Sequence, residues 1–209
     1  HVETMVRNMN EAERLGLRTW SRQLRAGRVA LRWREAVAGR SKGAVACSGE
    51  HSLVRSAGGS VWSFGEGEDG RLGHGSESKE VVPRLIAHLE QVVAVAAGYA
   101  HSMALSAEGR VFTWGCGHHG RLGHGDEDNR LVPTRVESLV GASVIAAGGA
   151  HSLAVVGGTG AVYSWGRGYF GQLGLGDTNN RYEPTAVPGF GGVVAVAVAA
   201  GQAGNHSLA

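Results

Sequence analysis

The stretch AAGYAHSMALSAEGRVFTWGCGHHGRLGHG, residues 96–125, decides the fold because most of it recurs along the chain. Its later part has close counterparts in GGSVWSFGEGEDGRLGHG (58–75) and, with one inserted residue, in TGAVYSWGRGYFGQLGLG (159–176). The pair His-Ser recurs first at intervals of fifty residues and then after a longer gap, at 51–52, 101–102, 151–152 and 206–207. Such self-similarity indicates an array of structural repeats.

One unit, about residues 92–141, shows what each repeat builds. The segments VVAVAAG, HSMALS, RVFTWG and LVPTRVESL are short, rich in β-branched or alternating residues, and separated by turn formers, with no helical segment between them. Four short strands per fifty residues are typical of a propeller blade. We therefore expect an all-β fold, a partial β-propeller of about three four-stranded blades at 44–91, 92–141 and 142–197, with a fourth beginning at 198–209.

Large apolar residues at fixed phases predict how the blades pack. Trp114 and Trp165, with Phe64 in the same place in the first copy, are expected to fill the core between blades. A leucine stands at one phase inside each glycine-rich loop, and we expect it to plug that loop between neighbouring blades: Leu72, Leu122 and Leu173.

These repeats resemble those of the regulator of chromosome condensation (RCC1) family, over about Val45 to Ala209. The resemblance implies a seven-bladed β-propeller, which these copies alone do not close, so the isolated chain is expected to aggregate or oligomerise through its open edges. The repeat is also similar to the plant UV-B photoreceptor branch. That branch implies tryptophans just before the repeated histidine, where this chain has Gly49-Glu50, Tyr99-Ala100 and Gly149-Ala150, so photoreception is disfavoured.

The glycines of the quoted stretch raise the question of nucleotide binding. Gly115-x-Gly117-x-x-Gly120 matches a dinucleotide fingerprint, but RLGHGDEDN follows it, where the fingerprint needs a helix. We therefore interpret the glycines as structural and expect no cofactor and no small-molecule substrate.

Metal binding and catalysis are also disfavoured. The repeated histidines mark the phase of the repeat and fall in different blades, whereas metal ligands must converge. The acidic stretch GDEDNR, 125–130, lacks calcium-loop spacing. Serine and histidine adjacent on a strand point to opposite faces, so the pair within one copy forms no dyad. We expect no metal site and no catalytic residue.

The loops after each third strand vary between copies, and variable tips on a uniform frame are how repeat proteins build binding surfaces. Tyr169 and Phe170, flanked by Arg167, are the strongest anchor candidates, although loop drift or packing on the next blade would explain them as well. The predicted partner-binding residues are Glu68, Asp69, Arg71, His118, His119, Arg121, Arg167, Tyr169, Phe170 and Gln172.

The N-terminal segment, residues 1–43, differs in composition from the repeats. Residues 1–42 hold ten Arg or Lys against four acids, and residues 10–39 contain helix formers and no proline. We expect a basic α-helical segment and a linker. Such a helix can bind calmodulin, an anionic membrane or nucleic acid, or simply pack on the acidic repeats or remain from a neighbouring domain.

The function predicted from the sequence is that of a non-catalytic protein–protein interaction module within a larger regulatory protein. The family resemblance implies two alternatives: a guanine-nucleotide exchange factor for a small Ran-type GTPase, and the substrate-binding propeller of a ubiquitin ligase. Two isolated cysteines, Cys47 and Cys116, form no disulfide framework and favour an intracellular protein of the cytoplasm or nucleus.

Overall fold

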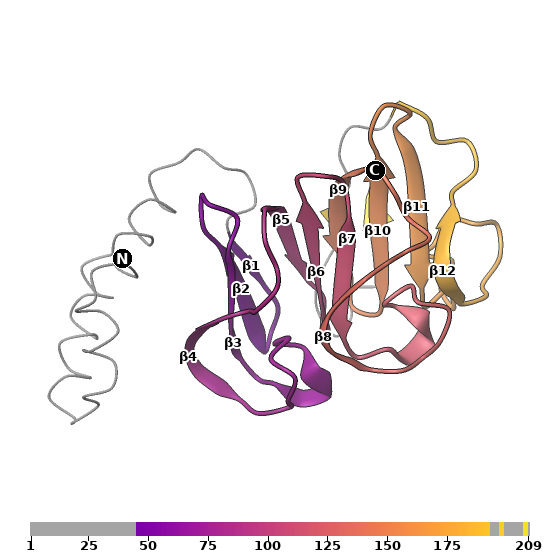
Figure 1. Ribbon diagram of the computed structural model, residues 1–209. Coiled ribbons are helices and arrows are strands. Elements are labelled where there is room, and N and C mark those ends of the chain that lie inside the picture. Colours follow the sequence, from indigo (N-terminus) through magenta and orange to yellow (C-terminus); the bar gives the residue numbers. More distant parts are fainter. Residues whose placement is uncertain (1–44, 193–196, 199–206, 209) are drawn as a thin grey trace, which may run out of the picture. The chain divides into compact units, whose positions relative to one another are not determined.

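The computed structural model describes residues 45–192, 197–198 and 207–208, and these form three four-stranded antiparallel sheets and one two-stranded sheet (Figure 1). This confirms the predicted all-β architecture of three blades. Blade 1 contains β1 (Val45–Cys47), β2 (His51–Arg55), β3 (Val61–Gly65) and β4 (Glu80–Leu85). Blade 2 contains β5 (Val92–Ala97), β6 (His101–Ser106), β7 (Val111–Gly115) and β8 (Arg130–Arg135). Blade 3 contains β9 (Ala142–Ala147), β10 (His151–Val156), β11 (Ala161–Gly166) and β12 (Arg181–Ala186).

A short strand pair follows blade 3. It consists of β13 (Ala197–Val198) and β14 (Ser207–Leu208), paired antiparallel. The predicted basic helix at 1–43 lies outside the described residues, as does His206. Within the described part of the chain, no helix is long and apolar enough to cross a membrane.

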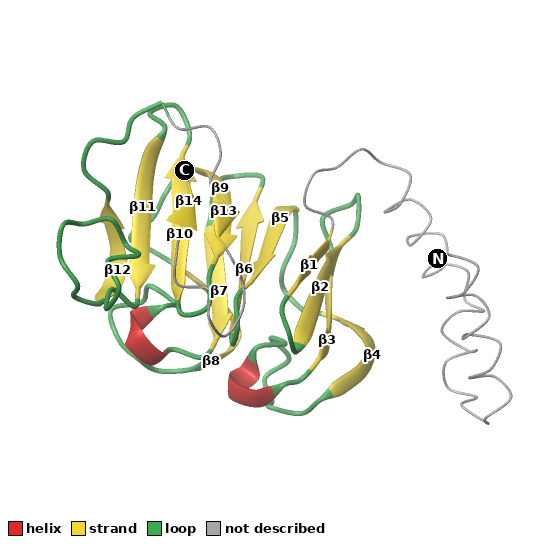
Figure 2. Ribbon diagram, turned by 180° about the vertical axis from the view of Figure 1, so that it is seen from behind, coloured by secondary structure: helices red, strands yellow, loops and turns green. Residues whose placement is uncertain are grey.

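Each blade is a simple meander in which strands pair in chain order with the same register. The repeated histidine opens the second strand and lies opposite the glycine that closes the third: His51 opposite Gly65, His101 opposite Gly115, and His151 opposite Gly166. The residue inserted in the third copy falls in the turn between β10 and β11, so it leaves this pairing intact. The loops between the third and fourth strands contain the two single-turn 3₁₀ helices, η1 (Glu68–Gly70) and η2 (His118–Gly120), shown in red in Figure 2.

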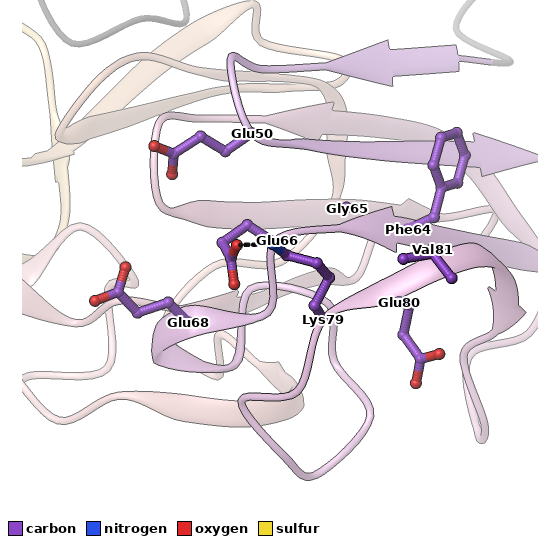
Figure 3. A pocket seen from close by; sticks show the side chains of 8 residues that line it. All are labelled: Glu50, Phe64, Gly65, Glu66, Glu68, Lys79, Glu80 and Val81. Carbon is purple, nitrogen blue, oxygen red and sulfur yellow. Dashed lines mark ion pairs between the residues drawn. The ribbon is translucent and has the colours of Figure 1, made fainter.

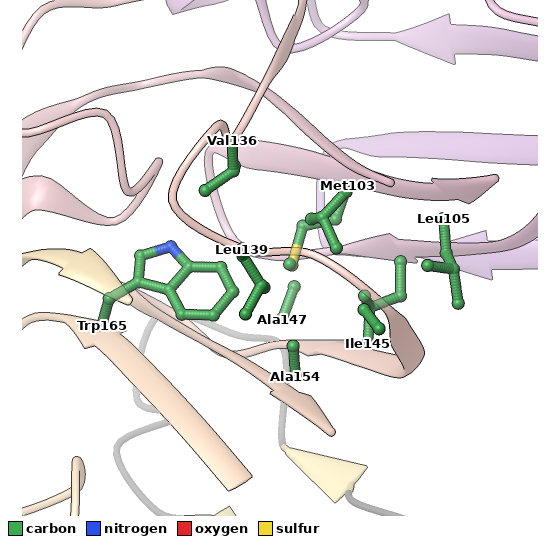
Figure 4. Close-up of a cluster of buried hydrophobic side chains, with 10 residues drawn as sticks. Met103, Leu105, Val136, Leu139, Ile145, Ala147, Ala154 and Trp165 are labelled. Atoms are coloured by element: carbon green, nitrogen blue, oxygen red, sulfur yellow. The ribbon is translucent and has the colours of Figure 1, made fainter. Parts of the chain in front are cut away.

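Two apolar seams join the blades. The first seam, between blades 1 and 2, buries Leu53, Val61 and Ile86 against Val95 and Trp114. The second seam repeats it, with Met103, Leu105, Val111, Val136 and Leu139 of blade 2 packed against Ile145, Ala147, Ala154 and Trp165 of blade 3 (Figure 4).

The seams confirm the packing expected of the tryptophans and loop leucines, whereas the expectation for Phe64 was wrong, since this ring is only half-buried and belongs to neither seam. Trp114 and Trp165 are fully buried, and Leu72, Leu122 and Leu173 are buried as well. Burying an aromatic or leucine side chain contributes roughly 1.5–3 kcal/mol to stability. The seams therefore hold each sheet against the next and fix the loops beside them.

Candidate partner-binding loops

The glycines of the loop frame are required by close backbone contact. The second glycine of each pattern, Gly67, Gly117 or Gly168, lies so close to the returning chain that an added Cβ would overlap the carbonyl of Ser78, Asp128 or Asn179. A nucleotide phosphate would need the space that this returning backbone fills. The pattern Gly-x-Gly-x-x-Gly therefore serves to fold the loop back onto itself.

The third loop departs from the first two at one position. Asp69 and His119 occupy the left-handed region, with φ of 59° and 65°, inside η1 and η2. Asp and His are among the residues that tolerate this conformation, whereas a bulky side chain such as Phe is strained there. Phe170 has the same place in blade 3 and is not among the residues with positive φ, and no 3₁₀ helix forms.

The repeated His-Ser pairs form hydrogen bonds across the seams. Nε2 of His51 lies 2.8 Å from Oγ of Ser102, and Nε2 of His101 lies 3.0 Å from Oγ of Ser152. Each serine donates its own proton to a carbonyl of the preceding loop, that of Arg71 or Arg121. The histidine is therefore the donor, and its Nε2 carries the proton.

The sequence predicted that the adjacent histidine and serine of one copy do not bond to each other, but it did not predict the bond between copies. Ser102 and Ser152 are fully buried and their protons point to main-chain oxygens, so these pairs fasten one blade to the next and do not expose a nucleophile. The signal in the sequence was that both residues keep their phase in every copy.

Burial keeps these histidines neutral. Desolvation, and secondarily the nearby Arg71, lower the pKa of His51 to about 4. Desolvation likewise holds the pKa of His101 well below its usual value, with Arg121 adding to the effect. The ring of His101 packs against Gly98, where an added Cβ would overlap it. In blade 1 Ser48 replaces that glycine, and its Oγ lies 2.9 Å from Nδ1 of His51.

Three of the predicted contact residues are buried. Arg71 forms ion pairs with Glu50, Glu68 and Asp69. Arg121 instead donates from Nε to the carbonyl of His118, at 2.9 Å, and from Nη1 to that of Gly149, at 3.5 Å; burial lowers its pKa. In the same place of blade 3, Gln172 accepts a hydrogen bond from the amide of Phe170, at 2.8 Å. These three side chains position the loops from inside.

The loop tips carry the other predicted residues. Glu68 and His118 are exposed, and Asp69 and His119 are half-buried. Asp69 accepts a hydrogen bond from Asn129 of blade 2 at 3.0 Å, so this position touches the following blade.

The densest group on these tips belongs to blade 3. Tyr169 and Phe170 are 67% and 56% exposed, and their rings meet edge to face with centroids 5.0 Å apart. The guanidinium carbon of Arg167 lies 5.0 Å from the Phe170 centroid and 5.7 Å from that of Tyr169. Two exposed aromatic rings held by a cation are the composition typical of an interface anchor.

The described residues contain no group of three or more potential metal ligands. In the acidic stretch, the carboxylate of Asp126 forms an ion pair with Arg130 at 2.7 Å. The charge of this turn is therefore balanced by an arginine of the same turn. Cys116 is buried and Cys47 is exposed, and neither is in a disulfide.

Three meander sheets with matching register, joined by two apolar seams of the same kind, define a repeat protein of the β-propeller class. The family model described as the regulator of chromosome condensation (RCC1) repeat matches residues 58–105, 108–155 and 159–209. The chain therefore belongs to the RCC1 repeat family, as the sequence resemblance predicted.

Known relatives extend this assignment. The chain is 42% identical over 169 residues to the human E3 ubiquitin-protein ligase HERC2, an alignment that covers 80% of this chain and 2% of that protein. The crystal structure of human WBSCR16 is similar at 30% identity with a TM-score of 0.66, covering 75% of this chain and 42% of that one. Prp20p from Saccharomyces cerevisiae has the same fold at 24% identity and a TM-score of 0.66, covering 79% of this chain and 44% of that one. The chain thus spans less than half of each relative.

Proposed function

We propose that this chain is a non-catalytic protein-interaction module, acting inside the cell as part of a regulatory protein, and that it binds its partner through the loop tips. The observation that carries the proposal is the exposed group of Arg167, Tyr169 and Phe170 on a frame that is otherwise repeated from blade to blade. The frame keeps the same register from blade to blade and the sequence varies at the loop tips that meet solvent, which suits recognition.

A non-catalytic role fits the chemistry of the described residues. The buried serines donate to carbonyl oxygens, the buried histidines are neutral donors, and the carboxylates of Glu50 and Asp126 are paired with arginines. None of these arrangements presents an activated nucleophile or a free general base at the surface.

Identity to HERC2 favours one specific form of this role, the recognition of a ubiquitination substrate. The aligned stretch is 2% of that ligase, so the ligase reaction itself would belong to other parts of such a protein. Exchange on a Ran-type GTPase has weaker support. The Prp20p structure was described together with binding of that protein to Gsp1p and histones, but at 24% identity the similarity concerns the fold.

The test is to compare the double variant Tyr169→Ala, Phe170→Ala with Phe190→Ala, a matched control that removes another exposed aromatic ring of the same repeat. A binding partner isolated with the full-length parent protein should bind the double variant about thirtyfold more weakly, corresponding to a loss of about 2 kcal/mol. The control should bind as the unmodified protein does, and both should melt normally. Equal affinity in the two variants would contradict the proposed surface.

Two further measurements separate the forms of the proposal. Ubiquitination of the captured partner, reduced by the double variant alone, supports the substrate-recognition role. Accelerated release of labelled GDP from a Ran-type GTPase, equally reduced, would establish the exchange role in its place.

A further inference from the structure

Arg71 and Arg121 occupy the same position in two successive loops, but the charges around them differ. Arg71 is paired with three carboxylates, those of Glu50, Glu68 and Asp69. Figure 3 shows two of them beside a pocket of about 580 Å³, together with Glu66, which is paired with Lys79. The tip of blade 1 is therefore acidic, and its buried arginine is neutralised within the same blade.

Blade 2 has lost all three of these carboxylates. The counterparts of Glu50, Glu68 and Asp69 are Ala100, His118 and His119. Arg121 is nevertheless buried, with 7% of its surface exposed. Among the described residues it donates to the main-chain oxygens of His118 and Gly149, and no carboxylate lies within ion-pair distance of its guanidinium. A buried charge without a counterion is costly, so an anion supplied from outside would stabilise this arginine.

Blade 3 adds a second cation beside Arg121. Arg167 stands where blade 1 has Glu66, and in the described part of the chain no carboxylate lies within ion-pair distance of it. Burial lowers the pKa of Arg121, and the charge of Arg167 adds to this effect. Burial and then the same two arginines lower the pKa of His119. The tips of blades 2 and 3 therefore hold a group of basic side chains: Arg121, Arg167, His118 and His119.

Asp69 and Glu127 lie near this group, but neither neutralises it. Asp69 opposes the lowering of the Arg121 pKa, yet its carboxylate pairs with Arg71 at 3.5 Å and accepts a hydrogen bond from Asn129 at 3.0 Å. Glu127 opposes the lowering of the His119 pKa and lies beyond ion-pair distance of every arginine in the described residues. The group of basic side chains thus stays short of negative charge.

Blade 1 shows that a carboxylate in solvent can reach an arginine buried at this position. The side chain of Glu68 is 74% exposed, yet its carboxylate lies 3.4 Å from Nη2 of Arg71, whose side chain is 2% exposed. His118 has the place of Glu68 in blade 2 and is exposed as well. A carboxylate of another molecule can therefore approach Arg121 from the side on which Glu68 approaches Arg71.

We infer that the tips of blades 2 and 3 bind the carboxylate side chains of an acidic protein segment, with Arg121 and Arg167 as the pairing cations. The inference rests on the proposed function, because it specifies the chemistry of the partner that contacts Tyr169 and Phe170. Arginine and carboxylate form strong charge-assisted hydrogen bonds, and blade 1 contains this arrangement within one chain. The acidic tip of blade 1 would repel the same segment and so confines it to blades 2 and 3.

The test converts the loop of blade 2 into that of blade 1 in the full-length parent protein. His118→Glu with His119→Asp gives the order Gly-Glu-Asp-Gly-Arg found at 67–71, so Arg121 acquires carboxylates of its own. The probe is a fluorescein-labelled hexaglutamate peptide, and fluorescence anisotropy at low ionic strength measures its binding. The loop variant should bind the probe at least about tenfold more weakly than the unmodified protein.

Further variants separate charge from loop shape. Arg121→Gln removes the cation but no ion pair of the described residues, so it should stay folded and bind the probe about tenfold more weakly. His118→Gln with His119→Asn keeps the loop neutral, since asparagine tolerates the left-handed region, and should weaken binding by about threefold at most. Arg110→Gln is the control for net charge, because Arg110 lies in the turn at the opposite end of β7, and it should leave binding unchanged.

Equal binding of hexaglutamate by the unmodified protein and the loop variant would overturn the carboxylate site, as would the absence of binding to either. Tenfold tighter binding of a phosphoserine peptide of equal length would overturn it in favour of a phosphorylated partner. The partner isolated with the parent protein separates this inference from the proposed function. If the aromatic double variant weakens that partner and the loop variant does not, only the carboxylate site fails. If the loop variant alone weakens it, the carboxylate site stands and the aromatic anchor fails.

Discussion

The two seams are built from the same repeat, yet the first satisfies more of its polar groups than the second. In the first, Arg71 is paired with carboxylates and its carbonyl accepts hydrogen bonds from both Ser102 and Trp114. In the second, no carboxylate of the described residues lies within ion-pair distance of Arg121, and Nε1 of Trp165 has no hydrogen-bond partner among them. Shape is thus repeated more faithfully than polar pairing, which indicates that apolar packing is the common stabilising element.

The largest effect is expected where shape is disturbed. Gly120→Ala would place a methyl group against the backbone of Tyr182 and force alanine into the left-handed region, at a cost of about 4 kcal/mol. Gly171→Ala is the matched control, because Gly171 has the same conformation with no atom near its missing Cβ, and should cost about 1 kcal/mol. Urea denaturation of both variants measures the difference. Similar losses would show that the seam tolerates the added methyl group.

A second effect is expected from pH. His51 has a pKa of about 4 when folded, below its ordinary value of 6.5, so the unfolded chain takes up a proton at higher pH than the folded one. The contribution of neutral His51 to the free energy of unfolding is therefore fully present above about pH 6.5 and is lost as the pH falls toward 4. Between pH 7.5 and 5, His51 alone should account for about 2 kcal/mol.

This dependence is measured by denaturation at each pH, with His51→Gln as the control. The variant should be less stable at pH 7.5 but lose less stability on acidification than the unmodified chain. His101, whose pKa is also lowered, continues to contribute in the variant. An identical pH profile for both proteins would count against the neutral histidine in the first seam.

The smallest effect separates the two arginines. Arg71→Gln should cost about 1.5 kcal/mol, because it removes the cation shared by Glu50, Glu68 and Asp69, which are partly in water. Arg121→Gln should change stability by no more than about 0.5 kcal/mol, since no ion pair is lost and burial already disfavours its charge. Thermal unfolding of the two variants measures this difference, and equal decreases in Tm would show that the two seams do not differ in polar pairing.

The sequence was sufficient to predict strands, blades and core because these depend on local pattern and period. Trp114, Trp165 and Leu122 were assigned to the packing between blades from their phase alone, and all three are buried. The repeat spacing does not predict which residue of one copy contacts which residue of the next copy. Those contacts depend on how the blades stack.

Two features show that limit. The bond between His51 and Ser102 joins residues in different copies, so it is invisible when each copy is considered separately. Arg71 was predicted to contact a partner because it stands in a loop that varies between copies, but Glu50, twenty-one residues earlier, supplies the charge that allows its burial. The exposed aromatic residues of blade 3 could be predicted from their residue types and their place in a variable loop. Their role in binding stays a prediction.

The bond between histidine and serine in neighbouring blades has an evolutionary consequence. Each copy contributes the donor for the blade after it and the acceptor for the blade before it, so one DNA segment encodes both halves of the joint. Tandem duplication of that segment would add a blade whose joints already match on both sides, with no compensating mutation needed. Loop tips could then diverge copy by copy, which is the pattern that the three blades display.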